Sequence, residues 1–405
     1  MTQPSNQSTP DRIRPHFSRD EQARKAFSSS LRRHVLGPQA AQLRETYEDK
    51  VEPEFRRSHG RVPKDGSEIR RAMRTERDFR FYSTIRTCAQ EMTFADVIPA
   101  VEREMASLAA EAKALSNDPT GGTLTLDPAL EVPDNVTQVD VHLAPGGYAS
   151  EFQEQDLSAG AIYDNAIQVF AFGQFGRDTN DIGMTMANFV RHRFPDLEPA
   201  RILDCGCTIG HNTLPWATTF PDAEVHGIDV APGILRYAHA RAQGLGIKTH
   251  FHQMNATALQ FPDNHFDVVF SSMFLHELPV PDIKAFFAEA RRVLRPGGVL
   301  WNMELPPNSA MGNYESFYLD WDSYYNNEPF YKPFRDQNYQ QLVVDAGFSA
   351  DSYLQATLPR YTFVGEEAFV ESLRQPAVFD SQTGRMDPKG TRWFGFGAVK
   401  QQGDR

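Results

Sequence analysis

The chain has few cysteines and no long apolar run. Its three cysteines (Cys88, Cys205 and Cys207) supply neither a disulfide framework nor a metal-ligand set at suitable spacing. No stretch approaches the roughly 18 apolar residues that a membrane-spanning helix needs, and the polar N-terminus does not resemble a signal peptide. We therefore expect a cytoplasmic protein that does not associate with a membrane.

Positive charge is scarce beyond the first quarter of the chain. Residues 1–110 carry 20 Lys and Arg against 16 Asp and Glu, whereas the remainder carries 21 against 37. Because phosphate recognition needs clustered positive charge, this balance argues against a nucleic-acid partner. Small molecules become the leading class of substrate.

A length of 405 residues predicts more than one domain. Residues 1–20 are rich in Ser, Thr, Gln and Pro and are expected to be a disordered tail. Residues 21–148 are expected to form a mainly helical domain that ends in a linker rich in Gly, Pro and Asp. Residues 149–405 then form the core, with an aromatic cap inserted at 305–335.

The first helical region carries an arginine-rich face. Arg70, Arg74 and Arg77 fall on one side of the expected helix, and Arg side chains bind carboxylates well. Acidic residues are interleaved with them. The face is therefore either a solvated, salt-bridged surface or a carboxylate clamp, and the sequence favours the first.

A strand, a glycine turn and a helix follow one another at Ala200–Thr213. The apolar strand ends in Asp204, and the turn carries Gly206 and Gly210, where the backbone has to bend sharply and approach a ligand closely. The helix that follows points free N–H groups at whatever binds there. A second apolar strand ends in Asp229, placed to accept hydrogen bonds from ribose hydroxyls. This layout predicts a nucleotide-type cofactor site.

Strands and helices alternate downstream of this turn. Residues 266–270 are a nearly continuous apolar run, as expected for a strand buried on both faces of a parallel sheet. Residues 281–294 carry one apolar helical stripe, which stops at Arg-Pro-Gly-Gly before another strand begins at Val299. The pattern predicts an α/β fold with a doubly wound parallel sheet and a ligand at the carboxyl ends of its strands.

Residues from about 198 to 300 resemble the core of a class I S-adenosylmethionine-dependent methyltransferase. The segments that carry the resemblance are Leu203–Gly210, Gly227–Asp229, Asn255-Ala256, Phe261–Asp263 and Val293–Gly298. The resemblance implies a seven-stranded, mostly parallel, Rossmann-like sheet with S-adenosyl-L-methionine as cofactor. Thr208 stands where the family usually has glycine, and Asn255 stands where it usually has aspartate. A nicotinamide cofactor is the competing interpretation of the glycine turn, but it does not explain the Asn255 segment.

The resemblance also implies which residues contact the cofactor. The glycine turn should touch its methionine end, Asp229 its ribose, and Asn255-Ala256 its adenine, with the Asn255 oxygen accepting from the adenine amino group. The predicted cofactor-binding residues are Asp204, Gly206, Cys207, Gly210, Asp229, Val230, Asn255, Ala256 and Ser271. Tyr163, on the preceding helix, either covers the sulfonium with its π face or packs against the sheet.

Acceptor binding is expected from the aromatic segment that follows the fifth strand. Its predicted substrate-binding residues are Tyr314, Phe317, Tyr318, Trp321 and Tyr325. An inserted cap at this place would close over the substrate and exclude water. Packing between subunits is the rival interpretation of these aromatic residues.

His276 is the candidate catalytic residue, because the resemblance places its loop beside the transferring methyl group. A histidine there has a suitable intrinsic pKa for a general base. The alternative is that it only orients neighbouring groups. Glu277 and Asp263 form no obvious ligand set with other acids, so transfer without a metal ion is expected.

The resulting prediction is a methyltransferase that acts on an oxygen, phenolic or carboxylic, of a small aromatic or apolar metabolite. The core motifs do not separate O-methylation from N- or C-methylation. A catalytically silent cofactor-binding protein that works through its helical region is the alternative from a different class. By analogy with related enzymes, the helical extension leaves a homodimer open.

Overall fold

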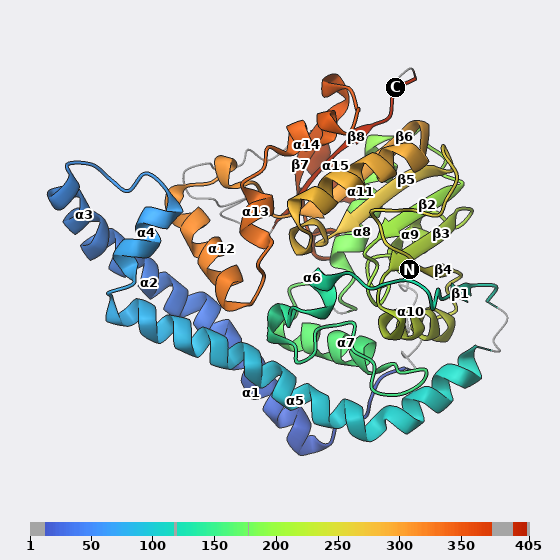
Figure 1. The fold of residues 1–405 in the computed structure, drawn as a ribbon, viewed down its shortest axis with the longest axis horizontal. Helices are drawn as coiled ribbons and strands as arrows, with labels where there is room; N and C mark the ends of the chain where they lie inside the picture. The colour runs from blue at the N-terminus through green and yellow to red at the C-terminus, as the bar shows by residue number, and fades with distance from the viewer. Residues whose placement is uncertain (1–12, 117–119, 177, 375–391, 403–405) are drawn as a thin grey trace, which may run out of the picture.

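The computed structural model describes residues 13–116, 120–176, 178–374 and 392–402. Residues 1–12, most of the expected tail, lie outside this range. A twisted α/β core occupies one side of the molecule, and a helical arm made largely of the N-terminal region extends away from it (Figure 1).

The core is built on one eight-stranded sheet with the order β1-β4-β3-β2-β5-β6-β8-β7. Strands β1 to β6 run parallel to one another, whereas β8 is antiparallel to both β6 and β7. The strands are β1 (Thr123–Thr125), β2 (Arg201–Cys205), β3 (Glu224–Asp229), β4 (His250–Gln253), β5 (Phe266–Ser272), β6 (Leu294–Glu304), β7 (Tyr353–Pro359) and β8 (Arg392–Val399).

Successive side chains of the central strands point to opposite faces of the sheet and belong to two separate hydrophobic layers. Ile202 and Val268 pack on one face of the sheet, whereas Leu203 and Val269, one residue later, pack on the other, as the two-residue period of a strand requires. Helices α8, α9 and α15 cover the first face, and α11 and α14 cover the second. Their bounds are α8 (Asp181–Arg193), α9 (Leu214–Thr219), α11 (Val280–Val293), α14 (Tyr339–Asp345) and α15 (Tyr361–Arg374).

The N-terminal region is dominated by one long helix, α5 (Arg77–Leu115), which packs against α1, α7 and α10 (Figure 1). None of the described helices combines the length and apolar character that crossing a bilayer requires. The other elements of this region are α1 (Arg19–His34), the π-helical turns η1 (Val35–Gln39) and η2 (Tyr47–Val51), α2 (Ala40–Thr46), α3 (Glu52–His59), α4 (Gly66–Met73), α6 (Asp134–Thr137) and η3 (Val141–Leu143). The two core helices that α5 contacts are α7 (Ser158–Phe170) and α10 (Pro232–Gly244).

The segment inserted between β6 and α14 forms a helical cap that joins the core to the arm. It contains η5 (Asn308–Ala310), α12 (Asn313–Tyr325) and α13 (Tyr331–Arg335), and α12 packs on α4 and α5. Arg335 is fully buried in this cap and forms an ion pair with Asp320 at 3.0 Å. Two short 3₁₀ turns complete the core, η4 (Leu275–Glu277) and η6 (Ala350–Ser352).

The expected fold class is confirmed, with one correction to the strand count. The sheet has eight described strands instead of seven, because β1 arises within the segment that the sequence indicates as a linker and adds an edge strand beside β4. The sequence pattern did not locate strand β7 or helix α15 along the chain. The division into domains stays a prediction.

Candidate active site

The turn after β2 is built as the sequence predicts. Gly206 has a φ of +78°, and a Cβ there would stand 2.3 Å from the Phe274 ring, so only glycine fits. Thr208 also adopts a left-handed φ of 44°, which explains why glycine is usual at this position. Its N–H group donates to Asp229 Oδ2 at 3.1 Å, which holds the turn against the end of β3.

Asp229 and Asn255 follow the carboxyl ends of β3 and β4. Asp229 accepts N–H groups from both Thr208 and Ala231, and burial raises the pKa of its carboxyl group. The Asn255 oxygen accepts from the N–H and the hydroxyl of Thr257, both at 2.9 Å. Both lone pairs of that oxygen are thus occupied, which leaves the Nδ2 group as the donor for an adenine ring instead of the expected oxygen.

A cavity opens where these strand ends meet residues 133–148 and the loop after β5. It encloses about 1140 Å³ of space, including open solvent at its mouth. Six of the predicted cofactor residues line it: Tyr163, Gly206, Asp229, Val230, Asn255 and Ala256. Among the residues that the structure describes, no Lys or Arg lines this cavity.

Four predicted cofactor residues lie behind the cavity wall. Asp204 accepts the Thr213 hydroxyl at 2.6 Å, and burial raises the pKa of its carboxyl group to about 7. Ser271 donates to Asn302 at 2.8 Å. Cys207 packs in a small apolar cluster, and Gly210 adopts a φ of 74° beside Phe251. None of these four residues lines the cavity, so their contact with a cofactor stays a prediction.

His276 is also buried behind the wall, in η4. Its Nδ1 lies 2.7 Å from Glu304 Oε2, and its Nε2 lies 3.6 Å from Glu277 Oε1. Burial by itself lowers the pKa of His276, but the Glu304 carboxylate outweighs it and raises this pKa to about 10. An imidazole that is already protonated at neutral pH cannot accept a proton, so this geometry argues against His276 as the general base and favours the orienting role.

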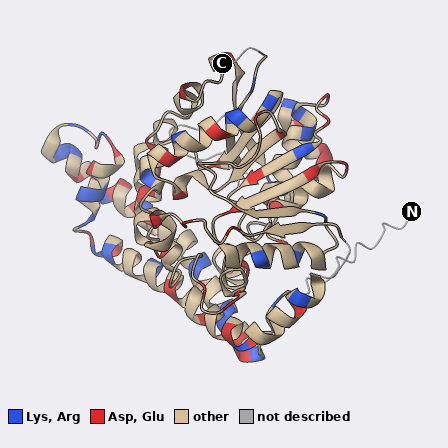
Figure 2. Cartoon of the chain, turned by 45° about the vertical axis from the view of Figure 1, so that its right-hand side comes forward, with Lys and Arg blue, Asp and Glu red and all other residues tan. Residues whose placement is uncertain are grey.

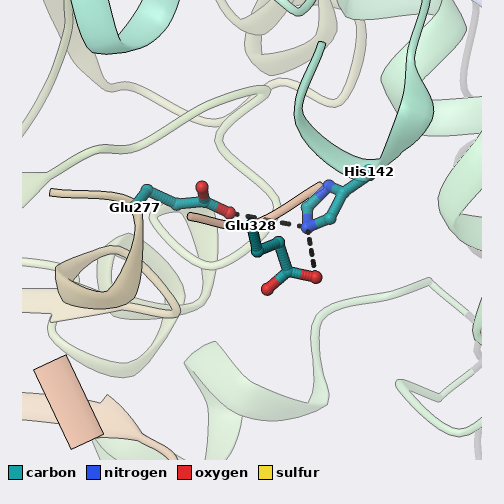
Figure 3. A group of neighbouring side chains, drawn as sticks. All are labelled: His142, Glu277 and Glu328. Carbon is teal, nitrogen blue, oxygen red and sulfur yellow. Dashed lines mark ion pairs between the residues drawn. The ribbon is translucent and has the colours of Figure 1, made fainter. Parts of the chain in front are cut away.

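Glu277, and not the expected His276, lines the cavity. Two residues that the sequence did not single out lie close to the Glu277 carboxylate. His142 from η3 and Glu328 from the loop between α12 and α13 point toward it (Figure 3). His142 Nε2 lies 3.5 Å from Glu277 Oε1 and 3.7 Å from Glu328 Oε1. We call these three residues the His-Glu-Glu cluster.

Burial sets the protonation of this cluster. It lowers the pKa of His142 to about 3, so the imidazole is neutral. Burial and the neighbouring Glu277 raise the pKa of Glu328 to about 8, and burial likewise raises that of Glu277. Asp263, the other acid considered from the sequence, instead pairs with Arg292 at 2.8 Å.

The expected substrate-binding aromatics serve a different purpose. Trp321 is fully buried, stacks on Tyr82 at 4.8 Å and donates its indole N–H to Ser83 at 2.9 Å, both in α5. All five predicted residues (Tyr314, Phe317, Tyr318, Trp321 and Tyr325) pack in or against one core with α4 and α5, and none borders the cavity. The apolar face of α12 packs against helices of the N-terminal arm. The cap residues that line the cavity are Pro329 and Phe330.

The arginine-rich face lies apart from the cavity. Arg74 and Arg77 are exposed, and Arg70 stacks over the Tyr324 ring at 4.2 Å. Lys and Arg interleave with Asp and Glu along the helices of the arm (Figure 2). This arrangement matches the solvated, salt-bridged surface and gives no support to a carboxylate clamp.

Comparison with known proteins shows which family the residues of this site resemble. Residues 202–298 match the family model described as "Methyltransferase domain". Demethylmenaquinone methyltransferase of Thermus thermophilus is 38% identical over 109 residues, which are 27% of this chain and 49% of that protein. Phosphoethanolamine N-methyltransferase 1 of Arabidopsis thaliana is 31% identical over 156 residues, 38% of this chain and 30% of that protein.

Among solved structures, phosphoethanolamine N-methyltransferase 2 of Haemonchus contortus with S-adenosyl-L-methionine is similar over 59% of this chain and 57% of that one. Its sequence identity is 23% and the TM-score is 0.39. The chain thus spans less than half the length of the curated relatives named above.

Proposed function

Because residues 202–298 form the core of a class I S-adenosylmethionine-dependent methyltransferase domain, we propose that the chain methylates a hydroxyl oxygen of a small molecule. The observation that carries this proposal is the wall of the cavity. This wall includes the turn and strand-end residues expected to hold the cofactor, and it also includes His142 and Glu277.

The residues present fit S-adenosyl-L-methionine. Gly206 leaves room that a Cβ would fill, and the buried Asp229 carboxylate lies at the cavity, where ribose hydroxyls can donate to it. Tyr163 also lines this cavity, and an aromatic ring there would favour the positive sulfonium. When bound, this cofactor supplies a methyl group that a nucleophilic oxygen can take from its sulfonium.

The charge of the cavity favours a hydroxyl acceptor over a carboxylic acid. An ionised acceptor would meet Glu277 without a described Lys or Arg to balance its charge. A hydroxyl is neutral when it binds, and it has to lose its proton as its oxygen attacks. Glu277 is the carboxylate at the cavity that can take this proton, and its raised pKa brings it closer to that of a phenol.

His276 and Glu304 act behind Glu277 as positioning residues. Glu304 accepts the N–H groups of Phe274 and Leu275 at 2.9 and 2.7 Å and also binds His276 Nδ1. These contacts fix the turn that carries Glu277. A misplacement of about 1 Å at such a site costs roughly 100-fold in rate, so this support is part of the site.

An amine acceptor is the second candidate, and the same carboxylates favour it. A protonated amine is attracted to Glu277 and would have to pass a proton to it before it attacks. The name of the Arabidopsis relative includes N-methyl transfer. C-methylation and a silent cofactor-binding role have no specific observation in their favour.

The test uses cofactor that is labelled on its methyl group, with panels of phenols, aliphatic alcohols, amines and carboxylic acids. We expect label in the phenol or alcohol panel, stable to mild base. Methanol released by mild base would reveal an ester and refute the argument from charge, and label in the amine panel alone would favour the second candidate. Saturable cofactor binding without turnover in any panel would favour the silent role.

Glu277→Gln tests the residue assigned to the proton. We expect turnover to fall by about 100-fold or more, because general-base catalysis typically contributes 10²–10⁴-fold. Cofactor affinity should change little. Glu102→Gln, at an exposed position of α5, is the matched control. Normal turnover in Glu277→Gln would remove Glu277 from the mechanism.

A further inference from the structure

We propose that His142, Glu277 and Glu328 bind one divalent transition-metal ion at the acceptor end of the cavity (Figure 3). The three side chains come from η3, η4 and the loop after α12, and their donor atoms all lie within 4.8 Å of one another. One imidazole nitrogen and two carboxylate oxygens form a donor set that suits zinc or manganese. The expectation of metal-independent transfer did not include this set, because His142 and Glu328 gave no signal in the sequence.

The spacing of the donor atoms fits a shared ion better than it fits hydrogen bonds. His142 Nε2 stands 3.5 Å from Glu277 and 3.7 Å from Glu328, beyond the range of a normal N–H···O bond. Ligands about 2.1 Å from a tetrahedral ion stand roughly 3.4 Å apart. The cluster therefore needs only small side-chain adjustments to close on a cation.

The charges of the cluster and of its neighbours favour binding of a cation. His276 lies 3.6 Å from Glu277 through its Nε2 but binds Glu304 more closely through its Nδ1, at 2.7 Å, and Arg86 binds Asp322 at 2.6 Å. The Glu328 side chain is buried and that of Glu277 is 28% exposed, so the two carboxylates repel each other when both are ionised. A bound dication would offset this repulsion.

Neighbouring groups orient the three ligands. His142 Nδ1 lies 3.1 Å from the Tyr148 hydroxyl, an arrangement that fixes the ring and leaves Nε2 directed at the cluster. Asn326 donates its Nδ2 group to Glu328, and Gln90 donates to the His142 carbonyl oxygen at 2.8 Å. Such outer contacts are typical of protein metal sites.

The open side of the site faces the cavity, because His142 and Glu277 both border it. An acceptor hydroxyl oxygen would complete the coordination there and lose its proton more readily, with the uncoordinated Glu277 oxygen taking it. This role in the reaction rests on the proposed function, whereas binding of the ion does not.

The experiment measures metal binding directly, without cofactor or acceptor. The full untagged chain is treated with a chelator, exchanged into metal-free buffer and titrated with Zn²⁺ and, separately, Mn²⁺ by calorimetry. We expect one ion per chain, and we expect its Kd to rise at least about 100-fold in His142→Ala and in Glu328→Gln, since loss of an outer-shell partner alone costs 10–100-fold. His34→Gln and Glu102→Gln, both at exposed positions, are the matched controls and should bind as the wild type does.

Two results would overturn the site. One is the absence of stoichiometric binding to the wild type, and the other is unchanged affinity in the His142→Ala/Glu328→Gln double variant. Circular dichroism and cofactor titration show whether each variant is folded. Nitrogen coupling from His142 in the electron-spin spectrum of bound Mn²⁺ should vanish in His142→Ala, a signature that a purely structural role would not produce.

Turnover measurements separate this inference from the proposed function. Ion binding with no methyl transfer to any acceptor would refute the proposed function and leave the metal site intact. Methyl transfer at full rate by metal-free protein would leave the proposed function and refute the role of the ion in it.

Discussion

A cluster of histidines at the edge of the sheet makes the fold sensitive to acid. His226 in β3 shares a ring-nitrogen contact of 3.1 Å with His252 in β4, and its Nε2 is buried without a hydrogen-bond partner. Burial, followed by the charges of His252, His250 and His265, lowers the pKa of His226 to about 3. Folding therefore requires this ring to be neutral.

The sign and size of the effect follow from this shift. A histidine whose folded pKa lies below its unfolded value of about 6.5 stabilises the protein fully above pH 6.5, and the contribution is lost as the pH falls toward the folded pKa. The loss grows by about 1.4 kcal/mol per pH unit, so His226 alone should remove about 2 kcal/mol between pH 7.5 and 5. Arg201 opposes protonation as well, whereas Glu224 acts in the other direction on His250 and His265.

His226→Phe tests this reasoning. The ring contacts Phe261 and Phe266 edge-on at 5.8 and 5.6 Å, so phenylalanine keeps the packing and removes the titration. Urea unfolding of the wild type and the variant at pH 7.5, 6.5, 5.5 and 5 should show a markedly flatter acid limb for the variant. His59→Gln, at an exposed histidine of α3, should keep the wild-type slope. Equal losses of stability in wild type and His226→Phe would refute the argument.

Two further predictions concern the cofactor turn and the cap. Gly206→Ala places a methyl group 2.3 Å from the Phe274 ring at a left-handed φ, so we expect at least a tenfold loss of affinity for S-adenosylhomocysteine by calorimetry; unchanged affinity would mean that the turn does not shape the cofactor site. Trp321→Ala removes a fully buried ring and its bond to Ser83, so the free energy of unfolding should fall by about 3–5 kcal/mol while cofactor affinity stays within twofold; a large loss of affinity would instead connect the aromatic core to the cavity.

The part of the site that a local motif encodes could be predicted from the sequence. Gly206 and Asp229 sit at strand ends, and the strand pattern itself tells where those ends meet. The cavity lining confirms that these positions lie together, although the contacts of each residue with a cofactor stay a prediction. Asp204 and Ser271 share the same motifs, but their side chains bind Thr213 and Asn302 and do not line the cavity, which the sequence pattern does not reveal.

The acceptor side could not be predicted in this way, because tertiary contacts decide it. The aromatic stripe of α12 indicates an apolar surface but does not tell which element packs on it. In the structure, Phe79 and Tyr82 of α5 pack against this surface. His142 lies in a segment whose Gly, Pro and Asp content indicates only irregular backbone. It is held there with a φ of 57°, next to Leu143 at 59°, in a region that residues with side chains seldom adopt.

The His-Glu-Glu cluster is a poor way to stabilise a fold, and this itself bears on its purpose. Glu328 is buried beside the half-buried Glu277, and each raises the free energy of the other in its ionised form. Glu328→Gln keeps an acceptor for Asn326 and removes one charge, so we expect metal-free protein to gain about 1–2 kcal/mol of unfolding free energy at pH 7.5. Zn²⁺ should raise the melting temperature of the wild type and not that of the variant. If Glu328→Gln instead lowers the stability of the metal-free protein, the Glu328 carboxylate stabilises the fold by itself. Its position beside Glu277 would then need no bound metal ion as an explanation.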